Sequence, residues 1–199
     1  MPFVHYARVR TVERSGAAAD AVLVGTAPSN QGSSITVHVY KSGLFSAFAH
    51  NHVIFAPINK QTVDAKNMSV EIVVLTKEMK VSDPEASGST RAEIQTTMLG
   101  PKVLDTDKYP QVHFKSSHVD KIDSGRYRVS GTLELHGTSK EISFEVSGAP
   151  DHYHGSTKLK QTEFGIQPVS IGGGTVKVKD QIEIDFDVYS GETANAGKH

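Results

Sequence analysis

Apolar and polar side chains alternate with a period of two along most of this chain, a pattern typical of β-strands that bury one face. Shorter alternating runs cover residues 34–40, 68–75, 111–116, 127–135 and 141–146. The longest run, 176–189, sets one mostly apolar face against a charged one, through Val176, Val178, Ile182, Ile184, Phe186 and Val188. The sequence therefore predicts an antiparallel sheet with one dry and one wet face.

Turn signals separate these runs. Residues 123–126, Asp-Ser-Gly-Arg, favour a hairpin, and residues 137–139, Gly-Thr-Ser, favour a second tight turn. Gly131 lies in mid-strand, which predicts a bulge, a bend or the close approach of another group. About eight hairpin-linked strands must hide their edges, and closing into a barrel does so. We expect an all-β, antiparallel barrel of about eight strands, whose interior is either filled or holds one small ligand.

Residues 81–109 break the period and predict a crossover with a short helix. Asp83-Pro84-Glu85 is typical of a helix start, residues 90–93 fit a capping box, and Leu99-Gly100-Pro101 ends the pattern. We expect this crossover to cover one end of the barrel. The domain division is then 1–33 as an N-terminal extension with a potential first strand, 34–189 as the barrel, and 190–199 as a flexible tail. Residues 149–156 are expected to form a solvated loop, and 170–175 a glycine-rich connection.

Composition narrows the function classes. The formal net charge of −1 gives no basic surface for nucleic acid, and the absence of Cys excludes disulfides and thiolate metal sites. No window reaches the roughly 18–20 apolar residues of a transmembrane helix. We expect a cytoplasmic protein as the chain stands, or a periplasmic one if an export signal is missing from it. No nucleophile elbow or phosphate loop is present, so we expect no enzyme, no catalytic residue and no cofactor.

Three segments resemble the YceI-like family. Residues 104–116, LDTDKYPQVHFKS, resemble its D-x-x-K-Y-P-x-(I/V)-x-F-x-S signature, and residues 131–140, GTLELHGTSK, resemble its G-x-L-x-(I/L)-x-G-x-(T/S)-K hairpin. Phe164-Gly165-Ile166 is similar to its late F-G-I. The three pieces occur in order at fitting spacing, and the similarity covers residues 34–189. The chain differs at 41–52 and at Val103-Leu104, where the family has Phe-Phe, so it resembles a divergent branch.

The resemblance implies a lipocalin-like barrel whose interior binds polyisoprenoid chains, such as polyprenyl phosphates or isoprenoid quinones. It also implies export to the bacterial periplasm and no established catalytic residues. We therefore expect a protein that binds or carries an amphipathic isoprenoid lipid. A homodimer is compatible with the sequence, which does not decide the oligomeric state.

A chain-like apolar ligand needs apolar walls, because each buried CH₂ contributes up to about 0.8 kcal/mol. The alternating faces supply expected wall residues, namely Phe114, Val129, Leu133, Phe144, Val146, Ile182, Ile184 and Phe186. Expected at the mouth or lid are Phe45, Phe48, Phe55, Met98 and Leu99. The candidate ligand-binding set is completed by Phe164, His50 and His52. Ordinary core packing is the alternative for each of them.

The histidines leave a second function open. His50 and His52 share one face of a strand, and with His38, His113 or His136 they would supply three nitrogens to a metal ion. A metal-binding enzyme or sensor is therefore the alternative, although hydrogen bonds to backbone groups or to a ligand head group explain the same residues. The third reading is an interaction module with a filled interior and an exposed apolar patch.

Overall fold

The computed structural model describes residues 32–42, 51–149, 152–171 and 176–190. Contacts divide the chain into Met1–Gln31 and Gly32–His199, and only the second unit is described below. The potential strand predicted within 1–33 and the tail predicted for 190–199 therefore lie almost entirely outside the described residues.

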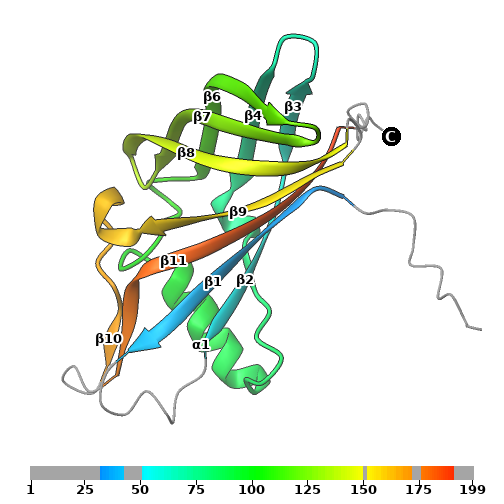
Figure 1. Cartoon of the computed structure of the whole chain (residues 1–199). Helices are drawn as coiled ribbons and strands as arrows, with labels where there is room; N and C mark the ends of the chain where they lie inside the picture. The colour runs from blue at the N-terminus through cyan, green and yellow to red at the C-terminus, as the bar shows by residue number, and fades with distance from the viewer. Residues whose placement is uncertain (1–31, 43–50, 150–151, 172–175, 191–199) are drawn as a thin grey trace, which may run out of the picture. The chain divides into compact units, whose positions relative to one another are not determined.

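The second unit is one curled antiparallel sheet with a short helix (Figure 1). Its first strands are β1 (Ser34–Ser42), β2 (His52–Pro57), β3 (Lys60–Asp64), β4 (Ser69–Leu75) and β5 (Lys80–Val81). The others are β6 (Gln111–Asp123), β7 (Arg126–Leu135), β8 (Thr138–Ala149), β9 (His152–Lys160), β10 (Ser170–Ile171) and β11 (Val176–Tyr189). The helical segments are η2 (Thr76–Glu78), α1 (Gly88–Leu99) and η3 (Gln161–Phe164). The predicted all-β class and the helix in the crossover are confirmed.

The strands pair in the order β3-β4-β6-β7-β8-β9-β11-β1-β2-β5, with β10 added beside β11. The curled sheet thus has eleven strands among the described residues, where the sequence predicted about eight. β3 and β5 form the two ends of this order, so the curl is not closed by a further ladder. At one end, the Gln61 side-chain amide on β3 donates a hydrogen bond of 2.5 Å to the Tyr189 carbonyl on β11. This contact links the end strand β3 to β11, which is not its neighbour in the order.

β8 and β9 pair only over a short stretch. Residues 146–149 face residues 152–155, and no further β8–β9 pairs continue the ladder in these strands. η3 contacts β8, β9 and β11 beyond that stretch. Its last residue, Phe164, has no exposed surface, and Gly165 adopts the left-handed conformation (φ 75°) that ends the turn. The Phe164-Gly165-Ile166 segment therefore fills the space where β8 and β9 no longer pair.

The helix begins later than the sequence predicted. Ser87 is the N-cap, and its hydroxyl accepts a hydrogen bond from the Thr90 backbone N–H, so α1 starts at Gly88. The prediction that Asp83-Pro84-Glu85 starts the helix is wrong. The Asp83 carboxylate instead accepts a hydrogen bond from the Val53 backbone N–H of β2, and its side chain is almost completely buried. A tertiary contact has overridden the local helix-start signal.

Two further local predictions have clear outcomes. A Cβ added to Gly131 would lie 2.3 Å from the Lys115 carbonyl oxygen, and the β6–β7 register shifts between Ser116 and His118. The predicted close approach and bulge at Gly131 are both confirmed. The solvated loop predicted for 149–156 is wrong, because His152 begins β9 and pairs with Tyr189 of β11.

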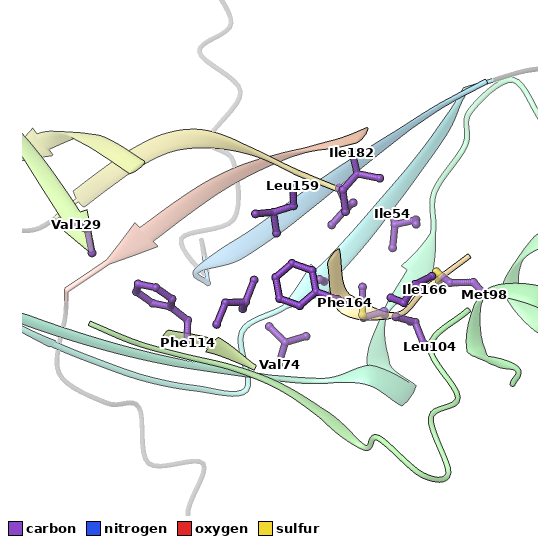
Figure 2. Packing of buried hydrophobic residues seen from close by; sticks show 14 of the residues in the cluster. Ile54, Val74, Met98, Leu104, Phe114, Val129, Leu159, Phe164, Ile166 and Ile182 are labelled. Atoms are coloured by element: carbon purple, nitrogen blue, oxygen red, sulfur yellow. The ribbon is translucent and has the colours of Figure 1, made fainter. Parts of the chain in front are cut away.

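The core lies inside the curl, and one end of it is densely filled. Figure 2 shows the Phe164 ring between side chains of opposite walls, with Leu159 and Ile182 on one side and Leu104 and Val74 on the other. All of these residues are at most 9% exposed. The filled end fixes the two walls relative to each other and leaves the interior beyond it as the candidate site.

Candidate functional site

The interior of the curled sheet contains a cavity of about 240 Å³. Its lining comes from nearly every long strand, because each strand turns alternate side chains inward. The floor is made of buried side chains, namely Val74, Met79, Leu104, Leu133 and Leu159. Leu104 belongs to the crossover that was predicted to cover one end of the barrel, so part of that crossover closes the cavity. Leu104 follows α1 in the chain, and no residue of α1 lines the cavity.

The middle of the wall carries three phenylalanines whose rings are in contact. The Phe114 and Phe144 ring centroids are 5.3 Å apart, and those of Phe144 and Phe186 are 5.1 Å apart. Gly155 makes room for the last ring, since a Cβ there would lie 2.8 Å from the Phe186 ring. The rings form a continuous apolar band across β6, β8 and β11.

The other end of the cavity reaches partly exposed residues. Asp64, the last residue of β3, lines this end together with Ala65 and Met68 of the β3–β4 turn, both of which are exposed. Tyr127 on β7 and Tyr153 on β9 also line this end, and their rings meet edge to face with centroids 5.9 Å apart. We refer to this end, from the β3–β4 turn to the two tyrosines, as the mouth.

The structure places seven of the predicted ligand-binding residues in the cavity wall: Phe114, Val129, Leu133, Phe144, Val146, Ile184 and Phe186. Their contact with a ligand stays a prediction. Six others do not line the cavity: His52, Phe55, Met98, Leu99, Phe164 and Ile182. Three more, Phe45, Phe48 and His50, lie outside the described residues.

The predicted residues that do not line the cavity lie elsewhere for physical reasons. Phe55 faces the outside of β2 and is 40% exposed, so the expectation that it lines the mouth is wrong. Met98, Phe164 and Ile182 face inward, but they pack into the filled core rather than along the cavity. Alternation predicts which face a residue occupies. It does not predict the level at which the interior becomes hollow.

Sequence reasoning missed most of the mouth. Tyr127 stands on the same face as Val129 in a run that was correctly predicted, so its inward position could have been found. Tyr153 was assigned to a loop. Met68 begins the alternating run 68–75 and could have been found in the same way, whereas Asp64 and Ala65 belong to no alternating run and only the fold brings them to the cavity.

His38, His52 and His113 each lie beside a different carboxylate. His52 Nδ1 lies 2.7 Å from the buried Asp83 carboxylate, while His38 and His113 lie 2.9 Å from Asp185 and Glu71 respectively. Among the described residues, no group of three His, Cys, Asp or Glu side chains is arranged to hold a metal ion. The proposed partners His38, His113 and His136 are thus not gathered around His52 in the part of the chain that is described.

Asp64 is the one charged residue in the cavity lining, within the described ranges. Its Oδ1 accepts hydrogen bonds from the backbone N–H groups of Lys66 (3.0 Å) and Asn67 (2.8 Å), and its Oδ2 accepts one from the Asn67 side chain (2.7 Å). The hydrogen bonds from Asn67 lower the pKa of this carboxyl below its ordinary value. The mouth therefore presents an ionised carboxylate at neutral pH.

None of the helices in the described ranges is long and apolar enough to span a bilayer. Among curated proteins, the chain is similar to a UPF0312 protein of Vibrio cholerae, with 28% identity over 114 residues, and to one of Vibrio parahaemolyticus, with 29% identity over 113 residues. These alignments cover 52% of this chain and only 58% and 59% of the relatives' own length.

Solved structures share the fold. BcnA of Burkholderia cenocepacia aligns with a TM-score of 0.55 at 17% identity, over 78% of this chain and 94% of that one. A YceI protein of Campylobacter jejuni aligns with a TM-score of 0.52 at 16% identity, over 67% of this chain and 81% of that one. The model of the YceI-like domain matches residues 29–189, which contain the whole sheet and its cavity. The chain belongs to the YceI-like family.

Proposed function

We propose that this protein binds one amphipathic isoprenoid lipid, with part of its hydrocarbon chain inside the cavity, and acts as a binding or carrier protein rather than an enzyme. The observation that carries the proposal is the hollow interior, lined by apolar strand residues and by the Phe114–Phe144–Phe186 band. Family membership supports a ligand-binding role.

The size and chemistry of the cavity support a flexible apolar chain. Its volume of about 240 Å³ is near the lower end of small-molecule sites, which run from roughly 300 to 1,000 Å³. A long isoprenoid therefore extends from the floor through the mouth. Its buried carbons supply the affinity, at up to about 0.8 kcal/mol per CH₂ before ordering costs are subtracted.

The test is native mass spectrometry of protein purified from bacterial cells without removing lipid. We expect an adduct whose mass matches an isoprenoid lipid, and uptake of an isoprenoid quinone or polyprenyl phosphate by delipidated protein. Bare protein that takes up neither class would overturn the proposal.

A blocking variant links uptake to the cavity. Val70 lines the cavity from β4, whereas Val73 of the same strand faces the other way and does not line it. Val70→Phe should fill part of the hollow and reduce uptake at least about tenfold, which corresponds to about 1.4 kcal/mol. Val73→Phe is the matched control and should bind as the unaltered protein does. Equal uptake by both variants would place the ligand elsewhere.

A further inference from the structure

The cavity lining sorts into a large apolar part and a small polar part. The uncharged polar members are Ser69, Tyr127, Tyr153 and Thr157, and the charged member among the described residues is Asp64. Lys, Arg and His are absent from the described lining. An anionic head group drawn into this mouth would meet a carboxylate and hydroxyls, with no cation in the wall to neutralise it.

The Asp64 carboxylate is fixed in place and stays charged. Its three hydrogen bonds come from the amide groups of Lys66 and Asn67, and they hold it within the β3–β4 turn. No salt bridge joins it to a cation within the described ranges. Its negative charge is therefore available to act on a head group at the mouth.

Two lysines near the mouth carry positive charges that would oppose the effect of the Asp64 carboxylate. Lys66 is exposed in the same turn, and Lys121 stands opposite Tyr127 in the β6–β7 register. Both side chains are exposed and neither lines the cavity, so water and salt screen their charge. Asp64 is half-buried and lines the cavity, so its charge belongs to the wall itself.

We propose that Asp64 is a charge filter at the mouth, which makes the cavity select isoprenoid lipids with an uncharged polar head, such as quinones, over those with a phosphate head. This inference rests on the proposed lipid-binding function and names its ligand class. The Tyr127 hydroxyl at the mouth offers a hydrogen bond to a carbonyl oxygen, which a quinone head carries. A phosphate would be desolvated beside a like charge.

The test uses two probes with isoprenoid chains of equal length, one a quinone and one a polyprenyl monophosphate. Their dissociation constants are measured for the full-length protein in the same buffer. We expect the quinone to bind more tightly by a factor on the order of ten, from one like-charge contact in a partly screened site. Asp64→Asn keeps an oxygen acceptor for the turn but removes the charge. It should tighten phosphate binding by a similar factor and leave quinone binding unchanged.

Asp107→Asn is the matched control. Asp107 is 91% exposed, pairs with Lys77 and does not line the cavity, so this change removes the same charge away from the site. It should alter neither constant. Equal binding of both probes by the unaltered protein would overturn the filter, and so would a preference that survives in Asp64→Asn. Binding of neither probe would instead overturn the proposed function, and the filter with it.

Discussion

The Tyr109 ring lies against the His136 ring, with centroids 4.4 Å apart, and this contact joins the two longest family signatures in space. Tyr109 belongs to the K-Y-P segment before β6, and His136 to the turn between β7 and β8. His136 Nδ1 also lies 3.3 Å from the Phe164 carbonyl oxygen of the third signature. The three segments therefore meet at the filled end of the fold, which indicates a structural role for the signature residues.

Gly137 lies at this junction, where both its backbone conformation and the adjacent Tyr109 ring disfavour any larger residue. Its φ is +72°, and an added Cβ would lie 2.5 Å from Cε1 of Tyr109. Gly137→Ala should lower the free energy of unfolding by about 1–3 kcal/mol, because it adds left-handed strain and a ring clash. Urea unfolding followed by far-ultraviolet circular dichroism measures the change. Gly88→Ala is the control, since nothing lies within 4 Å of its added Cβ, and it should leave stability unchanged or raise it by up to about 1 kcal/mol.

Asp83 holds the crossover to β2. Its carboxylate accepts from His52 and from the Val53 N–H, and its own carbonyl accepts from the Arg91 side chain on α1 at 3.0 Å. Asp83→Ala should cost about 1–3 kcal/mol in unfolding free energy, because the Val53 N–H loses its partner in a part-buried place. Asp107→Ala removes an exposed carboxylate and should change stability by less than about 0.5 kcal/mol. If the two variants unfolded at the same urea concentration, the structural role of Asp83 would be refuted.

Acid should weaken the fold through Asp180. Hydrogen bonds from the Thr162 backbone N–H and hydroxyl lower the pKa of this carboxyl below its ordinary value of 3.8. A group whose pKa is lower in the folded state stabilises it above the unfolded pKa, and that stabilisation is lost as pH falls through the folded pKa. The urea midpoint of the unaltered protein should therefore drop from pH 6 towards pH 3. Asp180→Asn should show a smaller drop, and an identical drop in both proteins would contradict the assignment.

Truncating a ring should cost more at the filled end than in the cavity wall. Phe164 has no exposed surface and is packed within the core, whereas Phe144 is partly exposed and borders the hollow. Phe164→Ala should lower unfolding free energy by about 3–5 kcal/mol, and Phe144→Ala by clearly less, because part of its surface has no partner atoms to lose. Chemical denaturation of both variants without ligand measures the difference. Equal losses would mean that the interior is filled.

The sequence predicted the long elements well, and the reason is their regular alternation. The strand over 176–189 was predicted with its observed bounds, since apolar residues recur on one face at every position but Asp180. Two-residue strands such as β5 and β10 carry no such period. β9 was missed because its inward residues are Tyr153, Gly155, Thr157 and Leu159, a set in which only Leu159 is aliphatic.

The site was predicted in part, for a related reason. Alternation identified Phe114, Phe144 and Phe186 as inward-facing, and the structure puts all three in the cavity wall. It could not place Asp64 there, because a polar residue at a strand end reaches the cavity only through the curvature of the sheet. It also could not separate Ile184, which borders the hollow, from Ile182, which is buried in the filled core.

The brief pairing of β8 with β9 has a mechanical consequence. Only residues 146–149 and 152–155 join the two halves of the sheet along that line, and η3 contacts β8, β9 and β11 beyond them. Side-chain contacts slide more easily than backbone ladders break. Along the rest of that line, the wall of this protein depends on the packing of η3, whose Phe164 has no exposed surface, rather than on a continuous ladder.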